Sequence, residues 1–264
     1  MKNNPIGIFD SGVGGLSVWK EIIKLLPTES ILYFADSGNC PYGNKTEDEI
    51  INLSKKIVDF FITKGVKLVV VACNTATAAA IDFLRSNYDI PFVGMEPAVK
   101  PAAVNTKKGI VGVLATEGTF NGRLFNNTTE KWASDIQIEI QVGKGFVELV
   151  ENGELDSDKA KSIVEKVVRP MLDRGIDQLV LACTHYPFLC ESIKSVSEES
   201  NIEIINPAPA VAKQVQNILE EQNRLTDEFN ILYEFYTSGK IKTLKFLVNK
   251  ILPNEKYLFQ KMKL

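Results

Sequence analysis

Two segments of this chain repeat one pattern at a separation of 110 residues. The first reads Lys64-Gly-Val-Lys-Leu-Val-Val-Val-Ala-Cys73, and the second reads Arg174-Gly-Ile-Asp-Gln-Leu-Val-Leu-Ala-Cys183. Each pattern indicates a helix end, a glycine suited to a left-handed C-cap, a buried strand, and then Ala-Cys where the strand ends. A strand that is apolar without alternation is typical of the centre of a parallel sheet.

Further landmarks keep nearly the same spacing. Glu96-Pro-Ala98 is matched by Asn206-Pro-Ala208, and Ile8-Phe-Asp-Ser11 has a weaker counterpart in Val113-Leu-Ala-Thr116. Because several matches occur in the same order, the chain is predicted to contain two related halves. Short apolar runs alternate with helical patterns, so the expected fold class is α/β, with two similar domains, mainly parallel sheets and a pseudo-two-fold relation between them.

Local patterns predict the individual elements. Strands are expected at 6–9, 31–34 and 68–72, and a helix is expected from the glycine-rich segment at 12–15 to about Leu26. Thr46-Glu-Asp-Glu49 is a capping-box sequence that predicts the start of an amphipathic helix, which ends near Lys64. The segment 211–264 predicts helices that pack on the first half, with a short strand near 233–237.

Composition and charge exclude several classes of protein. The chain has 264 residues, 45% of them hydrophobic and 24% charged, which is ordinary for a globular protein. A net charge of -3 and a pI near 5.5 argue against nucleic acid as a partner, because proteins that bind nucleic acid usually carry a surplus of basic residues. No apolar run approaches the roughly 18 residues of a membrane span, and the N-terminus has no signal-peptide pattern. The expected location is therefore cytoplasmic, with no membrane partner.

Metal and nucleotide sites are also disfavoured. The chain has four cysteines and one histidine, His185, and none of the cysteines forms a CxxC pair, so a structural zinc site is not expected. The run Gly12-Val-Gly-Gly15 superficially imitates a dinucleotide fingerprint, but Ser17 stands where a third small residue is needed. Asp10 would also place a negative charge next to a pyrophosphate.

The paired cysteines suggest the chemistry. Ligands of open parallel sheets bind beyond the carboxyl ends of the strands, where both Ala-Cys units are expected. If the halves face each other, the thiols of Cys73 and Cys183 flank one cavity from opposite sides. A thiolate that removes a hydrogen from one face of a carbon, with a thiol that delivers one to the other face, would invert that carbon.

Other interpretations remain open at this point. Cys183 and His185 alone could form a Cys–His hydrolase, for which Cys73 would be superfluous. The chain could also be a catalytically silent amino-acid-binding protein. Either cysteine could simply be a small buried apolar residue.

Four motifs together resemble the cofactor-independent glutamate racemases of the aspartate/glutamate racemase family. They are FDSGVGGLSV near the start, CPYG at 40–43, ACNTATA at 72–78 and ACTHYPFL at 182–189. The resemblance implies a racemase that supplies D-glutamate for peptidoglycan, uses no cofactor and no metal, and forms homodimers. A racemase for aspartate or another amino acid is the alternative. The resemblance also implies a first domain of residues 1–97 plus 208–264, a second domain of residues 98–207, and an active site between the two domains.

The resemblance carries roles over to individual residues. It implies that Cys73 and Cys183 are the catalytic acid/base pair, assisted by Asp10 on one side and by His185 and Glu151 on the other. The residues that it implies for binding the substrate are Asp10, Ser11, Tyr42, Gly43, Asn74, Thr75, Thr116, Thr119, Thr184 and His185.

Overall fold

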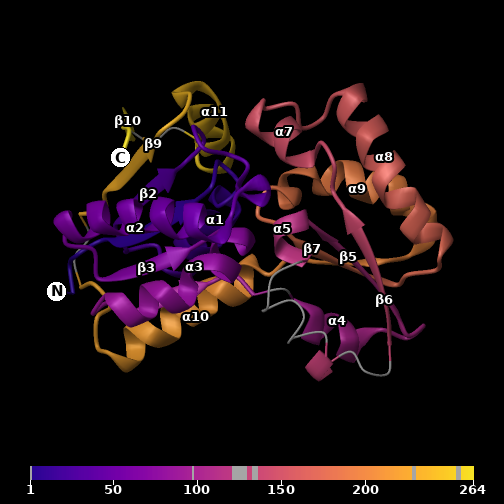
Figure 1. Ribbon diagram of the computed structural model, residues 1–264, viewed down its shortest axis with the longest axis horizontal. Coiled ribbons are helices and arrows are strands. Elements are labelled where there is room, and N and C mark those ends of the chain that lie inside the picture. The colour runs from indigo at the N-terminus through magenta and orange to yellow at the C-terminus, as the bar shows by residue number, and fades with distance from the viewer. Residues whose placement is uncertain (1, 97, 121–129, 133–135, 228–229, 254–256) are drawn as a thin grey trace.

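The computed structural model describes residues 2–96, 98–120, 130–132, 136–227, 230–253 and 257–264. They form two parallel sheets that lie side by side in two α/β halves (Figure 1). The strands are β1 (Ile6–Asp10), β2 (Ile31–Ala35), β3 (Leu68–Val71), β4 (Phe92–Gly94), β5 (Ile110–Ala115), β6 (Gln137–Val142), β7 (Gln178–Ala182), β8 (Glu203–Ile205), β9 (Tyr233–Thr237) and β10 (Leu258–Lys261).

The helices alternate with these strands, as the predicted α/β class requires. They are α1 (Leu16–Leu25), α2 (Glu47–Thr63), α3 (Asn74–Asn87), α4 (Val99–Asn105), α5 (Glu117–Phe120), α7 (Phe146–Glu151), α8 (Asp158–Asp173), α9 (Cys190–Ser197), α10 (Ala208–Glu221) and α11 (Ile241–Ile251). Short 3₁₀ turns lie at Tyr42–Asn44, Tyr186–Leu189 and Glu198–Ser200.

The strand order confirms the internal repeat. The first sheet contains the order β2-β1-β3-β4, and the second sheet has the matching order β6-β5-β7-β8. All pairings are parallel. The first sheet differs only by two further strands, β9 and β10, at its β2 edge. Of the repeated landmarks, Pro97 lies outside the described residues.

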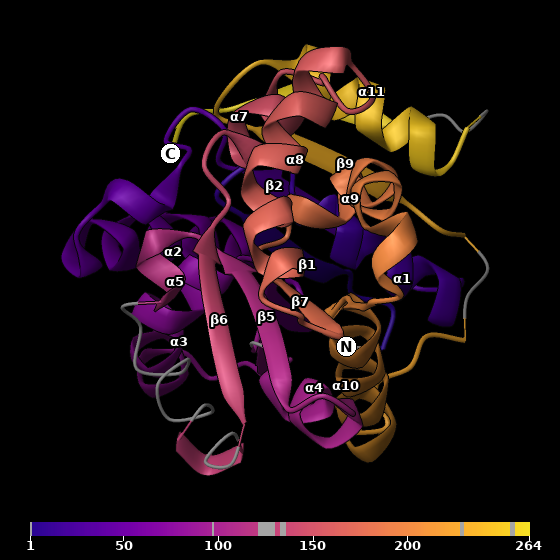
Figure 2. The same cartoon turned by 90° about the vertical axis from the view of Figure 1, so that its right-hand side faces the viewer.

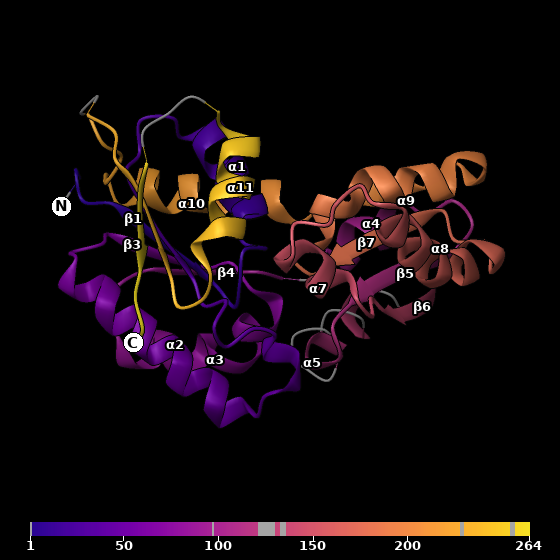
Figure 3. The ribbon, with the colours of Figure 1, turned by 90° about the horizontal axis from the view of Figure 1, so that it is seen from above.

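Helices cover both faces of each sheet (Figures 2 and 3). In the first half, one apolar cluster joins alternate strand residues to α1, α10 and α11, and a second joins the other strand face to α2 and α3. In the second half, α8 and α9 pack beside each other over one face, and α4 packs against β5 and β7 on the other.

The local signals in the sequence have clear structural counterparts. Thr46 caps α2, and its side chain accepts from the Glu49 backbone while the Glu49 side chain accepts from the Thr46 backbone. Gly65 and Gly175, the glycines of the repeat, adopt φ angles of 69° and 83°. These left-handed angles suit glycine because it has no Cβ to clash. At each glycine the chain turns from the end of a helix into the next strand, β3 after Gly65 and β7 after Gly175.

The C-terminal segment returns to the first half. Helix α10 packs on α1, and β9 pairs with β2 in the position predicted for a strand. Strand β10, which the sequence did not indicate, then adds to the outer edge of β9. Among the residues described, no helix combines the length and apolar character that crossing a membrane requires.

Candidate active site

One small cavity lies where the two halves meet, and both repeated cysteines line it. Its volume is about 20 Å³. The lining residues are Ser11, Pro41, Tyr42, Gly43, Cys73, Asn74, Thr75, Thr116, Thr119, Val147, Cys183, Thr184 and His185. Most of them directly follow the carboxyl ends of β1, β3, β5 and β7. The chain therefore brings the two thiols into the same pocket, together with nearly all of the side chains expected to hold a substrate.

Cys73 stands at the junction of β3 and α3. Its sulfur accepts a hydrogen bond from the backbone N–H of Ala76 at 3.4 Å, so it caps the helix, and it lies 3.6 Å from the hydroxyl of Ser11. Burial, and then the neighbouring charge of Asp10, raise the pKa of Cys73 to about 12. In the free protein this group is a thiol rather than a thiolate at neutral pH.

Asp10 lies behind the cavity wall and joins the two halves. Its Oδ1 accepts the backbone N–H of Gly12 at 2.8 Å, and its Oδ2 accepts the hydroxyl of Thr184, from the other half, at 2.6 Å. Complete burial raises the pKa of Asp10, although His185 and these hydrogen bonds oppose the shift. A carboxyl group whose pKa moves toward that of a thiol is better matched to exchange a proton with it.

Cys183 has its own polar partners in the second half. Its sulfur lies 3.9 Å from Nδ1 of His185, and Nε2 of His185 lies 2.7 Å from Oε1 of Glu151. Burial disfavours the charged imidazole, but hydrogen bonds with Cys183, Cys40 and Glu151 outweigh it and raise the pKa of His185 well above its ordinary value. Burial likewise opposes ionisation of Glu151, yet its hydrogen bond with His185 leaves the pKa of Glu151 lowered.

Glu151 is held from the first half as well. The backbone N–H of Val13 donates to Oε1 at 2.7 Å, and the hydroxyl of Ser37 donates to Oε2 at 2.9 Å. On the other side, the hydroxyl of Thr243 in α11 donates to the Glu151 carbonyl at 2.8 Å. The carboxylate therefore has a fixed orientation toward His185.

The glycine-rich segment after β1 allows this close packing. A Cβ added at Gly12 would lie 2.0 Å from Oε1 of Glu151, and one added at Gly14 would lie 2.3 Å from Nδ1 of His185. The same segment receives Glu151 at the N–H of Val13. These glycines make room for side chains of the opposite half, so their resemblance to a dinucleotide fingerprint has a packing cause.

A cluster of hydroxyl and amide groups completes the cavity. Thr75, Thr116 and Thr119 contact one another through their hydroxyls at 3.0 to 3.4 Å, across the boundary between the halves. Asn74 is buried, and neither polar atom of its side chain has a hydrogen-bond partner among the residues that the structure describes. A buried amide without a partner costs free energy, so it is well placed to receive a polar ligand.

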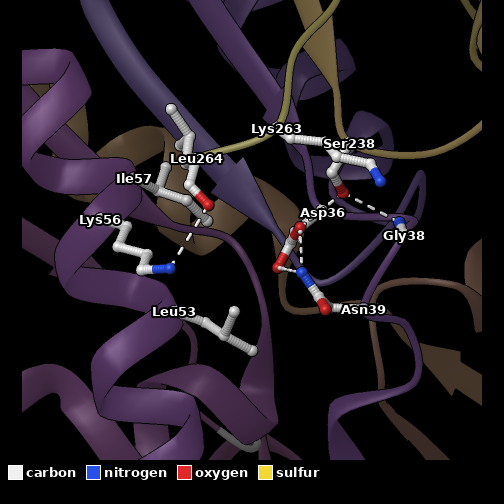
Figure 4. A pocket seen from close by; sticks show the side chains of 9 residues that line it. All are labelled: Asp36, Gly38, Asn39, Leu53, Lys56, Ile57, Ser238, Lys263 and Leu264. Carbon is white, nitrogen blue, oxygen red and sulfur yellow. Dashed lines mark hydrogen bonds between the residues drawn. The ribbon is translucent and has the colours of Figure 1, made fainter.

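The loop after β2 brings Tyr42 and Gly43 to the cavity. Tyr42 is buried, and its hydroxyl donates to Oδ2 of Asp36 at 2.6 Å. Asp36 also accepts from Asn39 and from Ser238, a residue of the C-terminal segment (Figure 4). A cavity of about 280 Å³ adjoins this anchor. Through Ser238, the C-terminal segment supports a loop that lines the candidate active site.

Some residues of the site had no individual signal in the sequence. Pro41 and Val147 line the cavity, and Ser37 orients Glu151. Cys40 lies next to His185, close enough to act on its pKa. Cys40 and Pro41 could have been found through the CPYG motif, to which they belong. Ser37 and Val147 could not, because their roles depend on contacts between distant segments.

Comparison with known proteins identifies the family of this chain. The Asp/Glu/Hydantoin racemase model matches residues 6–215 of this chain. A glutamate racemase of Herpetosiphon aurantiacus is 47% identical over 242 residues, covering 90% of this chain and 94% of the relative.

Solved structures resemble the whole fold. The Escherichia coli glutamate racemase, in complex with L-glutamate and the activator UDP-MurNAc-ala, has a TM-score of 0.88 and 32% identity, with 98% of each chain covered. A Francisella tularensis glutamate racemase in complex with D-glutamate has a TM-score of 0.84 and 29% identity, covering 100% of this chain and 98% of that one. By its matched family model, its curated relative and its fold, this chain belongs to the Asp/Glu/Hydantoin racemase family.

Proposed function

We propose that this chain interconverts L- and D-glutamate by exchanging the α-hydrogen between two cysteines. The observation that carries the proposal is the placement of Cys73 and Cys183 on the walls of one cavity, each at the end of an equivalent strand. Inversion of a carbon needs an acid and a base on opposite faces, and two thiols from opposite halves meet that need. The relatives named glutamate racemase support glutamate as the substrate.

The two thiols have different polar neighbours: Asp10 acts on the pKa of Cys73, and His185 lies beside Cys183. Cys73 is a protonated thiol because burial raises its pKa to about 12. Cys183 lies 3.9 Å from Nδ1 of His185, so the imidazole is placed to exchange a proton with that sulfur. In the direction from L to D, Cys183 removes the α-hydrogen and Cys73 delivers one to the opposite face. In the reverse direction the roles exchange, and Asp10 accepts the proton of Cys73.

The polar wall of the cavity is suited to the charged ends of an amino acid. The unpaired amide of Asn74 and the hydroxyls of Ser11, Thr75 and Thr184 offer donors and acceptors to the α-carboxylate and the amino group. Backbone N–H groups at the start of α3 add donors for a carboxylate. Donors aimed at the α-carboxylate would stabilise the negative charge that develops when the α-hydrogen leaves.

The cavity has room for about one water molecule. Glutamate is much larger, so binding requires the lining segments to separate. Since those segments belong to both halves, a relative movement of the halves is the simplest way to admit the substrate. Closure around the amino acid would then exclude water from the carbanionic intermediate.

Incubation with L-glutamate in heavy water tests the proposal. The expected product is D-glutamate that carries deuterium at Cα. NMR measures the loss of the α-hydrogen signal, and chiral chromatography measures the D-enantiomer. Cys73→Ala should abolish racemisation, whereas a Cys–His hydrolase would keep its activity. Cys190→Ala changes a cysteine outside the cavity and serves as the matched control. Absence of deuterium and of D-product from the wild type would refute the proposal, and faster turnover of aspartate would change the substrate.

The wider role follows from the same proposal. Production of D-glutamate would supply peptidoglycan synthesis in the cytoplasm, where free thiols such as the four of this chain stay reduced. We also propose the family's homodimer and the division into residues 1–97 plus 208–264 and 98–207. The return of β9 and β10 to the first sheet supports that division. Light scattering coupled to size-exclusion chromatography measures the oligomeric state.

A further inference from the structure

Three side chains with different ligand atoms meet beside the candidate active site, which one of them, His185, also lines. Cys40 comes from the loop after β2, Glu151 from the end of α7, and His185 from the turn after β7. The Cys40 sulfur, a Glu151 oxygen and a ring nitrogen of His185 all lie within 4.8 Å of one another. Within the described residues, this is the one group of at least three such side chains with that spacing.

We propose that Cys40, Glu151 and His185 form an inhibitory site for a thiophilic divalent cation, best matched by Zn²⁺. This site goes beyond the proposed racemase function. A thiolate, an imidazole and a carboxylate are the three ligand types that zinc uses in proteins. Three protein ligands leave a fourth position for water, as in open zinc sites.

The spacing of the atoms suits a tetrahedral ion. Zinc–ligand distances of about 2.0 to 2.3 Å place neighbouring ligand atoms about 3.4 Å apart. The 2.7 Å between Nε2 of His185 and Oε1 of Glu151 is slightly shorter than this, and the 4.8 Å limit of the cluster is longer. Small side-chain rotations would bring all three to the required spacing, with the ion replacing the proton between His185 and Glu151.

The surroundings orient the ligands and give an ion a route to them. Ser37 and the N–H of Val13 hold the Glu151 carboxylate, as outer partners of metal ligands do. The Glu151 side chain is 18% exposed. Glu151 also lines an open cavity of about 640 Å³, together with Ser37 and Gly38, and neither Cys73 nor Cys183 lines that cavity. An ion can therefore approach from solvent without passing through the substrate cavity.

Binding of the ion would stop the proposed chemistry through His185. An imidazole coordinated through Nε2 keeps one N–H at Nδ1, beside Cys183, but it can no longer take up a second proton, and coordination requires Cys40 to lose its own proton. The ion would also tie the loop after β2 to the second half and so oppose the opening that glutamate needs. Cys40 contributes to this inhibition, while the proposed hydrogen transfer uses only Cys73 and Cys183.

Titration with Co²⁺, a spectroscopic substitute for Zn²⁺, tests the site directly on the full chain. The wild type should show thiolate-to-cobalt charge-transfer absorbance that Zn²⁺ displaces and EDTA removes. Cys40→Ser should abolish this band, whereas Cys190→Ser, a change in another half-buried cysteine, should retain it. This readout needs no turnover, so it remains informative if the proposed racemase function fails.

Inhibition gives the second measurement. Zn²⁺ should slow wild-type racemisation reversibly, and Cys40→Ser should raise the inhibition constant by about 10–100-fold, each variant being compared with its own metal-free rate. Cys40→Ala should behave in the same way, and thermal unfolding verifies that both variants fold. No cobalt band in the wild type, or an unchanged band in both Cys40 variants, would overturn the proposal. The second result would place the metal on other thiols, including the catalytic pair.

Discussion

Substitution of Gly12 by alanine should disable the support of Cys183 without touching either thiol. The new Cβ would lie 2.0 Å from Oε1 of Glu151, where real Cβ contacts are essentially never shorter than 3.0 Å. The carboxylate must therefore move by about 1 Å or more. Both 2.7 Å hydrogen bonds, with His185 and with the N–H of Val13, end on this same Oε1, so the movement breaks or lengthens both of them.

The size of the effect follows from the lost hydrogen bond to His185. A hydrogen bond to a charged group contributes about 1.5–3 kcal/mol. If that contribution is lost from the transition state in which Cys183 gains or gives up a proton, kcat/KM falls by about 10–100-fold. Both directions slow, because the two enantiomers are connected by the same pair of transfers.

A kinetic isotope effect identifies which transfer has slowed. With Cys183 impaired, the isotope effect on kcat/KM should increase for α-deuterated L-glutamate, whose deuterium goes to Cys183. It should decrease for α-deuterated D-glutamate, whose deuterium goes to Cys73. Glu151→Gln should reproduce both changes, and Glu148→Gln, an exposed carboxylate on the same helix, should change neither. A Gly12→Ala enzyme with wild-type kinetics, or with the opposite isotope pattern, would refute the reasoning.

Three further predictions concern single buried groups. Thr184→Val removes the donor to the Asp10 carboxylate, so urea titration should show a loss of about 1.5–3 kcal/mol in the free energy of unfolding, which Thr184→Ser should largely avoid. Burial raises the pKa of Cys73 to about 12. The difference in thiolate absorbance between wild type and Cys73→Ser should therefore stay flat up to about pH 10, and a step near pH 8.5 would contradict this. Lys67 and Glu29 form a buried ion pair at 2.5 Å, so Lys67→Met should destabilise the fold by about 3–5 kcal/mol in thermal or urea unfolding, and adding Glu29→Leu should recover most of that loss.

Local sequence patterns predicted the elements that local physics controls. The capping box at Thr46 produces the start of α2, and Gly65 and Gly175 adopt the left-handed conformations expected of helix ends. The apolar runs before Cys73 and Cys183 become fully buried central strands. These features depend on residues a few positions apart, so a single sequence contains the information needed to place them.

Elements whose stability depends on distant contacts escaped prediction. Strand β10 has four residues and is largely exposed. Its apolar pair Leu258-Phe259 is too short to indicate a strand by itself, so its pairing with β9 defines it. The role of Ser37 depends on the carboxylate of Glu151, 114 positions along the chain. Cys40 meets His185 only because separate loops from the two halves converge.

The duplicated Ala-Cys pattern by itself determined that two related α/β halves would present a thiol at the end of an equivalent strand. Strand formation and burial follow from the order of apolar residues, which is local. Only the tertiary structure decided that both sulfurs line one cavity. It also decided two hydrogen bonds between the halves: Asp10 accepts from the hydroxyl of Thr184, and Glu151 accepts from the N–H of Val13. These contacts depend on the packing of the two halves, since their partners are separated by more than a hundred residues and no local pattern specifies their distance.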